Sequence, residues 1–545
     1  MLTGRAQLAL GFLAVAASQP GLAADAPAAA PGPARAVAPV GERAFDIWEF
    51  SVDGNSLLDD ADIQAVLEPF LGPGRRASDV DAARTTLEKL YHQLGYRTVA
   101  VSIAPRQTVN DGVIQLNVVE GRVARLSVLG TEYTSLEQIK SEVPSLAEGQ
   151  VPDFGQVQKD LVYANRFQTR RVTPSLQPGA APGTVNIDLN VEDRLPLRVF
   201  TELNNRFSKG TTERRALVGL GYDNLFQRGH SLTLTFQTAP ERMDDGRVYL
   251  ANYLMRFGDG SWSLQASGLR TTSNVTAFSG IGVVGSGSSV GLKLIRQLPD
   301  VDGKLYPSVS LGADYKHFNT VTTVAPAEIR TPSRYLPLSL SYSQFLRLEQ
   351  QRVQTDVTLA FASTKVGSDN ETLDLNRYGA RGGMWYLRGS INYSLDLFAG
   401  FELALKLAGQ VTDQPLISSE QFSAGGMDSV RGYLEAEALG DNGGLAALEL
   451  QAPSIPDLFA SRRWASYLSE LRPFLFFDTA SVSLRGPFPD AGTRRSSTLR
   501  SSGAGISMRV GDNLSLFFDW SQPLREGPYT PKGDGRLLFR VSASL

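Results

Sequence analysis

An arginine and an aspartate, far apart in the chain, are the residues best suited to one specific chemical contact. Arg431 follows two glycines within a long segment that separates two strand-like runs. Its forked, permanently charged guanidinium pairs well with a carboxylate. Asp478 lies in an otherwise apolar strand-like run, where a charge is costly unless it is paired. The sequence therefore predicts an ion pair between Arg431 and Asp478, although a surface arginine and a solvated aspartate would give the same spacing.

The residues around this pair form two short motifs. The loop motif contains Gly425, Gly426, Val430, Gly432 and Tyr433, and the strand motif contains Phe476, Phe477 and Asp478. Paired glycines allow a loop to fold back tightly. We therefore predict that a tightly folded loop presents Arg431 to the strand that carries Asp478.

Two glycine-rich stretches match enzyme signatures only by letter. Residues 280–285 fit the dinucleotide fingerprint and residues 287–291 fit the nucleophile elbow, but both signatures require a following helix and none is predicted there. A flexible glycine-rich loop and the start of a barrel strand are the interpretations that fit the context. Cysteine is absent and the three histidines are scattered, which gives no metal-ligand spacing. We predict that the protein is not an enzyme and has no cofactor or metal site.

Composition narrows the class of protein. A chain of 545 residues is long enough for several domains. A net charge of -3 gives no reason to expect nucleic acid as a partner. The 52 glycines, 26 phenylalanines and 17 tyrosines favour strands and turns. We therefore expect a strand-rich protein that does not bind nucleic acid.

The N-terminus has the layout of an export signal. Arg5 supplies a positive charge, an apolar run follows at 8–17, and small residues at 21–24 fit a cleavage site. We assign residues 1–24 to a signal peptide, with a short N-terminal anchor as the alternative. The frequent prolines of residues 25–44 predict an extended linker. An exported, cysteine-free, strand-rich chain indicates the envelope of a Gram-negative bacterium.

One structural pattern occurs twice between residues 45 and 194. The first copy has a predicted strand at 45–52, helices at 59–71 and 79–94 (with Ser78 as the cap), and strands at 99–104 and 113–119. The second copy has a strand at 124–130, helices at 135–143 and 153–167, and strands at 171–176 and 184–191. This repeated β-α-α-β-β order predicts two small α+β domains, at 45–121 and 122–195.

Each of these domains would have a mixed sheet with an edge strand. An edge strand can accept a strand from another chain. Val99, Val101 and Ile103 lie in one such predicted strand and are candidate contacts for a bound protein. The same alternation would also fill the core of the domain, so the sequence leaves both interpretations open.

The pattern changes after residue 195 to segments of alternating polarity. Residues 231–236, 338–342, 403–407 and 514–520 are examples, and turns or glycine-rich loops separate such segments. Roughly sixteen segments of this kind occur between 196 and 545, which is typical of a membrane β-barrel with apolar residues facing lipid. A soluble β-sandwich is the alternative, but it does not explain so long a continuous pattern after an export signal.

Together these features resemble the outer-membrane transporters of two-partner secretion, the TpsB family, within the wider superfamily of barrel assembly factors. The resemblance rests on the paired α+β domains, the barrel pattern, and the two motifs around Arg431 and Asp478. It implies two periplasmic polypeptide-transport-associated (POTRA) domains before an antiparallel barrel of about sixteen strands. It also implies that a loop at 412–442, between the eleventh and twelfth strands, folds into the lumen. There Arg431 would meet Asp478 on the thirteenth strand.

The resemblance implies a function in protein export across the outer membrane. The POTRA domains would bind an unfolded exoprotein in the periplasm, and the barrel would pass it to the cell surface. Other implied partners are outer-membrane lipid and the barrel assembly machinery that inserts the protein. Some family members plug the pore with an N-terminal helix, but the prolines of 25–44 argue against one. The loop would then be the main plug, or the linker would thread the pore without being helical.

Three questions stay open at the level of the sequence. A factor that inserts other barrels is the alternative function, and it would have many clients and a weak lateral seam. A passive porin would need neither of the repeated domains. The client itself could be an adhesin, a cytolysin or a contact toxin.

Overall fold

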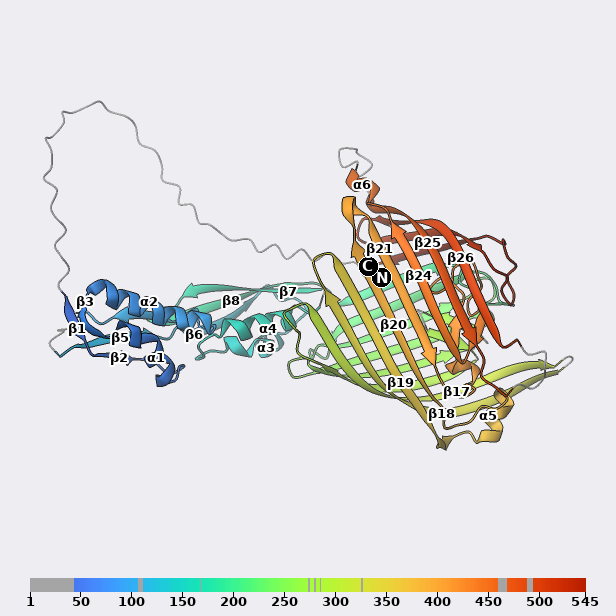
Figure 1. The fold of residues 1–545 in the computed structure, drawn as a ribbon, viewed down its shortest axis with the longest axis horizontal. Coiled ribbons are helices and arrows are strands. Elements are labelled where there is room, and N and C mark those ends of the chain that lie inside the picture. Colours follow the sequence, from blue (N-terminus) through green and yellow to red (C-terminus); the bar gives the residue numbers. More distant parts are fainter. Residues whose placement is uncertain are drawn as a thin grey trace, which may run out of the picture.

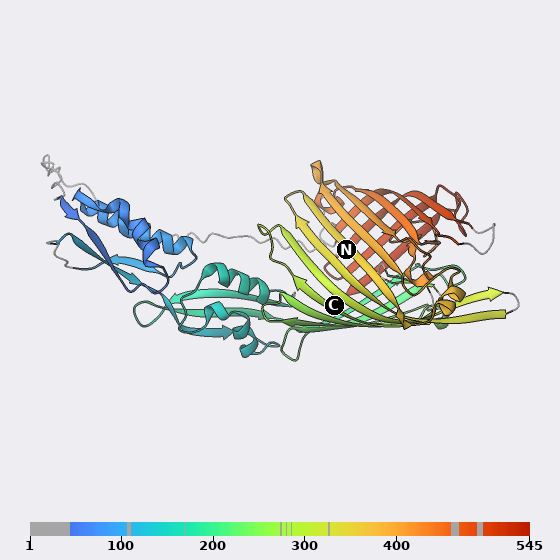
Figure 2. The same cartoon turned by 60° about the horizontal axis from the view of Figure 1, so that its bottom comes forward.

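The computed structural model describes most of the mature chain. The described residues are 44–105, 111–167, 169–272, 275–278, 281–284, 286–324, 327–458, 468–487 and 494–545. The predicted signal peptide and the predicted linker, except for its last residue, lie outside them. Two small α+β units stand in a row and lead to one end of a large barrel (Figures 1 and 2). We call that end of the barrel proximal and the opposite end distal.

The first unit is a three-stranded sheet covered by two helices. Its elements are β1 (Phe45–Ile47), β2 (Glu49–Asp53), α1 (Asp60–Leu67), a 3-10 turn (Glu68–Phe70), β3 (Gly72–Arg75), α2 (Ala77–Gln93), β4 (Ala100–Ile103) and β5 (Val113–Val119). Strand β5 is central, parallel to β2 and antiparallel to β4. Helix α2 packs on this sheet because Val80, Leu87 and Tyr91 recur at helical spacing and are buried.

The first unit departs from the prediction in three places. The strand expected at 45–52 is divided into β1 and β2, and β1 pairs with β3, which the sequence pattern did not predict. The predicted cap at Ser78 is wrong, because α2 already begins at Ala77 and Ser78 lies inside it. The Asp79 carboxylate instead accepts a hydrogen bond from the Arg76 backbone N–H at 2.8 Å, which satisfies one free donor of the first turn.

The second unit repeats the order of the first. Its elements are β6 (Arg122–Leu129), α3 (Leu136–Glu142), a 3-10 turn (Pro144–Leu146), α4 (Phe154–Ala164), β7 (Arg170–Pro178) and β8 (Thr184–Asp193). Strand β8 is central, parallel to β6 and antiparallel to β7. Both helices begin at side-chain caps, since Ser135 accepts from Gln138 N and Asp153 accepts from Gly155 N.

The remaining chain forms a closed antiparallel barrel of sixteen strands, which confirms the predicted architecture. The strands are β9 (Leu197–Asn204), β10 (Arg215–Leu225), β11 (His230–Thr238), β12 (Val248–Phe257), β13 (Trp262–Thr271), β16 (Ser286–Gln297), β17 (Leu305–Val324), β18 (Ala327–Arg347), β19 (Gln351–Gly367), β20 (Trp385–Asp396), β21 (Glu402–Val411), β24 (Asn442–Gln451), β25 (Leu468–Ser483), β26 (Ser496–Val510), β27 (Leu514–Pro523) and β28 (Arg536–Ser544). Pairing of β28 with β9 closes the ring. Among the described residues, no helix is long and apolar enough to cross a bilayer.

Short elements lie in the connections between barrel strands. They are β14 (Val275–Phe278), β15 (Ile281–Val284), α5 (Asn370–Asn376), β22 (Phe422–Ala424), β23 (Ala438–Gly440), α6 (Ile455–Leu458), and 3-10 turns at Met243–Asp245, Phe398–Gly400 and Ser418–Glu420. Strand β15 lies within the stretch predicted as a flexible glycine-rich loop, and it pairs with β14, so that expectation was wrong for these residues. Residues 280 and 285 lie outside the described part. Residues 287–291 belong to β16, as predicted.

Candidate functional site

The connection between β21 and β24 is buried inside the barrel. It runs from residue 412 to 441, and within it β22 pairs with β23 to form a small hairpin. Its side chains contact residues from the first barrel strands, the middle of the wall and the last strands. A segment that reaches such distant parts of a closed wall must cross the lumen. We call residues 412–424 and 438–441 the base of this loop and residues 425–437 its tip.

Arg431 lies at the centre of the tip and binds two carboxylates of the wall. Its Nε donates to Asp478 Oδ2 at 2.8 Å and its Nη2 donates to Asp478 Oδ1 at 2.9 Å, a bidentate pair. Its Nη1 donates to Glu449 Oε2 at 2.7 Å, and its backbone N–H donates to Asp478 Oδ2 at 3.1 Å. The guanidinium carbon lies 3.5 Å from the centre of the Phe476 ring, at cation–π distance. The structure thus brings Arg431, Asp478 and Phe476 together.

The alternation of β25 explains why Asp478 faces inward. Phe474, Phe476 and Asp478 are buried, whereas Leu475 and Phe477 between them are exposed on the outer surface. Period-two alternation places the buried residues in the lumen and the exposed ones against lipid. Barrel interiors are usually polar, but here two phenylalanines face the lumen because Arg431 of the loop tip covers them.

The other residues of the loop motif shape the tip. Gly425 and Gly426 both have φ of 104°, a conformation that residues with a side chain rarely adopt. A Cβ atom at Gly426 would lie 2.3 Å from the Glu435 carboxylate. Val430 is fully buried, and the Tyr433 hydroxyl lies 2.6 Å from the carbonyl oxygen of Arg525. Gly432 has a φ of 88°.

The sequence analysis did not predict several contacts of charged residues in or near the tip. Arg206, which follows β9, binds Glu435 at 2.9 Å and Asp428 at 2.8 Å. Glu437 accepts hydrogen bonds from the backbone N–H groups of Tyr529 at 2.6 Å and Thr530 at 2.7 Å. The sequence did contain one sign of these contacts: acidic residues outnumber the single arginine of residues 412–442. Such an excess requires donors from elsewhere when the loop is buried.

The structure corrects the prediction for the edge of the first unit. Strand β4 is an edge strand, but Val99 and Val101 belong to the core of the unit and only Ile103 has an exposed side chain. The outward backbone groups of Val101 are also occupied: its N–H donates to Glu88 at 3.4 Å and its carbonyl accepts from Arg84 at 3.3 Å. Side chains of α2 therefore cover this edge.

The second unit is attached to the proximal turn between β10 and β11. Gln227 of that turn donates to the Tyr133 carbonyl at 2.9 Å and accepts from the Ser135 N–H at 3.0 Å. Gly229 in this turn has a φ of 70°, a conformation that residues with a side chain rarely adopt, and a Cβ there would lie 2.3 Å from the Arg166 guanidinium.

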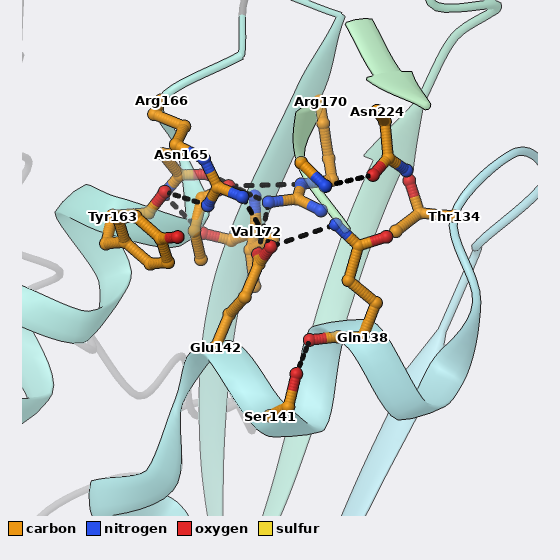
Figure 3. A network of polar contacts seen from close by, with 12 residues as sticks. Thr134, Gln138, Ser141, Glu142, Tyr163, Asn165, Arg166, Arg170, Val172 and Asn224 are labelled. Carbon is orange, nitrogen blue, oxygen red and sulfur yellow. Dashed lines mark hydrogen bonds and ion pairs between the residues drawn. The ribbon is translucent and has the colours of Figure 1, made fainter. Parts of the chain in front are cut away.

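Beneath this contact, buried charges converge within the unit, as Figure 3 shows for Glu142, Arg166 and Arg170. Glu142 accepts from Arg166 at 2.7 Å and forms a second ion pair with Arg170. Burial lowers the pKa of Arg170, and the charge of Glu142 opposes that shift. From the barrel, Arg256 of β12 lies 5.5 Å from the centre of the Phe167 ring. The second unit and the barrel are thus joined by specific contacts.

Comparisons with known proteins agree with this architecture. A model of the family described as "Haemolysin secretion/activation protein ShlB/FhaC/HecB" matches residues 183–508, and a model of the ShlB-type POTRA domain matches residues 45–121. The outer membrane transporter CdiB of Dickeya dadantii is 23% identical over 455 residues, which are 76% of this chain and 74% of that protein. The heme/hemopexin transporter protein HuxB of Haemophilus influenzae is 22% identical over 495 residues, 84% of this chain and 80% of that protein.

Solved structures share the fold at low sequence identity. The structure of CdiB from Escherichia coli has a TM-score of 0.66 at 17% identity and covers 94% of this chain and 93% of its own. A structure of BamA from Haemophilus ducreyi that lacks POTRA domains 1-3 has a TM-score of 0.53 at 17% identity, with 92% and 100% covered. The family model matches more than half of the chain, and the chain therefore belongs to the ShlB/FhaC/HecB family of haemolysin secretion/activation proteins.

Proposed function

We propose that the protein is a translocation pore of two-partner secretion, which binds an unfolded exoprotein in the periplasm and passes it through the barrel lumen to the cell surface. The protein is an outer-membrane barrel with its N-terminal POTRA domain in the periplasm. The observation that carries the proposal is a buried loop that crosses the lumen, with its tip held to the wall by ion pairs, in a barrel whose proximal end adjoins the periplasmic units. Folding of the client outside the cell would supply the driving force.

The second unit, residues 122–195, is proposed to be a second POTRA domain. Its elements follow the order of the first unit, and its contacts with Gln227 and Arg256 fix it to the barrel entrance. A client bound to the first unit would then be passed along a fixed second unit to the lumen. Of the three predicted contacts Val99, Val101 and Ile103, only Ile103 remains a candidate through its side chain.

The pair of Arg431 and Asp478 is proposed to lock the tip in the closed position. Removing Arg431 would leave the carboxylates of Asp478 and Glu449 without their charged donor, and one partner lost from a buried ion pair costs about 3–5 kcal/mol. The misplaced tip would no longer form the productive closed state from which secretion starts. We expect Arg431→Ala to assemble normally and to lose most of its secretion activity.

The experiment compares three variants in cells that produce the client. Assembly is measured by the heat-dependent shift of the folded barrel on gels, and secretion by the exoprotein in the medium. Arg431→Lys keeps the charge without the bidentate fork and should retain part of the activity. Arg214→Ala is the matched control, since Arg214 is exposed and its ion pair with Glu241 is 3.5 Å long. Normal secretion by Arg431→Ala would remove the lock from the proposal.

A factor that inserts other barrels is the second candidate function. It would require a seam that opens sideways, and the β28–β9 ladder has only five residue pairs. Hydrogen bonds between Val199 and Leu545, and between Asn205 and Phe539, extend this seam at both ends. The tagged full-length protein, isolated with its bound clients from cell envelopes, distinguishes the two functions. One large secreted protein supports the secretion pore, whereas many barrel precursors support the insertion factor.

A further inference from the structure

The base of the loop has its own buried anchor, which is separate from the tip. Glu420 is 1% exposed and lies at the end of the 3-10 turn of the base. Its Oε1 accepts from Lys316 Nζ at 2.6 Å and from the Tyr335 hydroxyl at 2.6 Å, and its Oε2 accepts from the Tyr386 hydroxyl at 2.8 Å. These donors come from β17, β18 and β20, a different part of the wall from β24 and β25, which hold Arg431.

Apolar packing surrounds this carboxylate. Leu416 and Ile417 of the base belong to one buried cluster with wall residues Tyr335, Ala360, Ala362 and Tyr386 and with Leu373, Ala380 and Met384 of the connection between β19 and β20. The Glu420 carbonyl oxygen also accepts from Gln410 Nε2 at 3.0 Å. Moving the base away from the wall would therefore expose apolar surface and break a fully paired carboxylate at the same time.

Asp441 fastens the other limb of the base. It is fully buried, and its Oδ1 accepts from the Leu416 N–H at 2.9 Å and from Gln421 Nε2 at 2.9 Å. Its Oδ2 accepts from the Arg485 N–H at 2.6 Å. One carboxylate thus ties the returning limb to both the outgoing limb and the connection after β25.

The junction between base and tip contains residues about which the backbone can rotate. The β22–β23 pairing ends at Ala424 and Ala438, and Gly425 and Gly426 follow at once, both at positive φ. Glycine reaches many backbone conformations without a steric penalty. The tip beyond this pair is held by ion pairs and by packing of Val430 and Tyr433 against the wall. The base is held separately, by the Glu420 and Asp441 carboxylates and by its own apolar cluster.

We propose that Glu420, with Lys316, Tyr335 and Tyr386, fixes the base of the loop to the wall throughout secretion, so that only the tip beyond Gly425 and Gly426 leaves the lumen. This inference rests on the proposed function, because it assigns the moving part of the same plug. Glu420 is a positioning residue in this scheme. The glycine pair is the hinge about which the tip swings.

Cross-linking in full-length protein tests which part moves. The chain has no cysteine, so introduced cysteines react alone. Ser419→Cys with Tyr335→Cys joins base to wall, since the two native side chains meet at 2.8 Å. Asp428→Cys with Arg206→Cys joins tip to wall at the site of a 2.8 Å ion pair. A short bis-maleimide replaces the lost side-chain length in both pairs, and each variant without cross-linker is its own control.

The expected result is a difference between the two cross-links. The base cross-link should leave secretion within twofold of its untreated control, and the tip cross-link should reduce it at least tenfold. A base cross-link that blocks secretion as the tip cross-link does would overturn the inference and leave the secretion pore standing. If neither cross-link blocks secretion, the loop is not a plug that has to move, and the inference fails together with the lock proposed for Arg431 and Asp478.

A second measurement tests the anchor without cysteines. Tyr335→Phe combined with Tyr386→Phe keeps both rings in the cluster and removes two hydrogen-bond donors from Glu420. We expect the open probability of the channel in planar bilayers to rise at least tenfold. An unchanged open probability would contradict a role for this cluster in holding the loop.

Discussion

The periplasmic units and the barrel lumen are held together by different kinds of contact. Each unit has an apolar core built mainly from its own neighbouring elements, such as the cluster around Leu87, Leu116 and Tyr91. In the lumen, buried charges are paired across long stretches of chain, as Arg431 is with Asp478 and Arg206 is with Glu435. Cores of this kind tolerate small local changes, whereas a buried ion pair that loses one partner leaves a desolvated charge. The difference predicts stable units beside a plug that can be released by rearranging charges.

The second unit is an exception to this comparison, because it contains buried charges. Removing one of them should give the largest loss of stability. Glu142→Ala would leave Arg170 buried without its carboxylate, which should destabilise the unit by about 3–5 kcal/mol. Proteolysis of the membrane-embedded protein measures this, because cleavage follows the population of the opened unit. Glu137→Ala on the exposed face of the same helix is the control. If the two variants resist proteolysis equally, these buried charges do not stabilise the second unit.

A somewhat smaller loss of stability is expected when the apolar core of the first unit is changed. Leu116 is fully buried in the centre of its sheet, and Leu116→Ala should cost about 2–5 kcal/mol through lost burial and the cavity left behind. Client binding should fall while the channel conductance of the closed barrel stays unchanged. Val119→Ala on the exposed side of the same strand serves as the control. A change in conductance with Leu116→Ala would show that the core of the first unit is coupled to the loop in the lumen, and would contradict their independence.

The smallest effect concerns the covered edge of β4. Glu88→Ala removes the acceptor of the Val101 N–H at a cost of at most about 1 kcal/mol, as expected for a half-exposed contact. Hydrogen exchange of the Val101 amide should accelerate severalfold. Asp81→Ala removes a more exposed partner of Arg84 and should leave that amide unchanged. If Val101 exchanges at the same rate in both variants, α2 does not protect this edge.

Most of the fold could be predicted from local pattern. The repeated unit order follows from apolar residues at helical spacing, as in α2. The barrel follows from period-two alternation, which β25 shows clearly. The division of the first strand into β1 and β2 could not be predicted, because both halves have strand-forming sequences and only the pairing of β1 with β3 separates them.

The candidate site was predictable only where a motif pointed to it. Arg431 and Asp478 stood out because one follows a glycine pair and the other interrupts an apolar strand. Glu420 and Arg206 did not, since a single acid or arginine in a loop has the pattern of a solvated residue. For Val99 and Val101 the sequence left core packing and client contact both open, for a related reason. Alternation shows that a strand has two faces, but not which of them the helix covers.

The most direct test of the central claim asks whether the client passes through the lumen. A photo-reactive amino acid replaces Lys293 of β16. Its neighbours Leu292 and Leu294 are exposed on the outer surface, so the alternation of the strand directs position 293 into the barrel lumen. The matched control places the same group at Leu294. During active secretion, the secretion pore predicts a cross-link to the exoprotein from position 293 and none from position 294. A cross-link from the lipid-facing position alone, or from neither during measurable secretion, would contradict passage through the barrel.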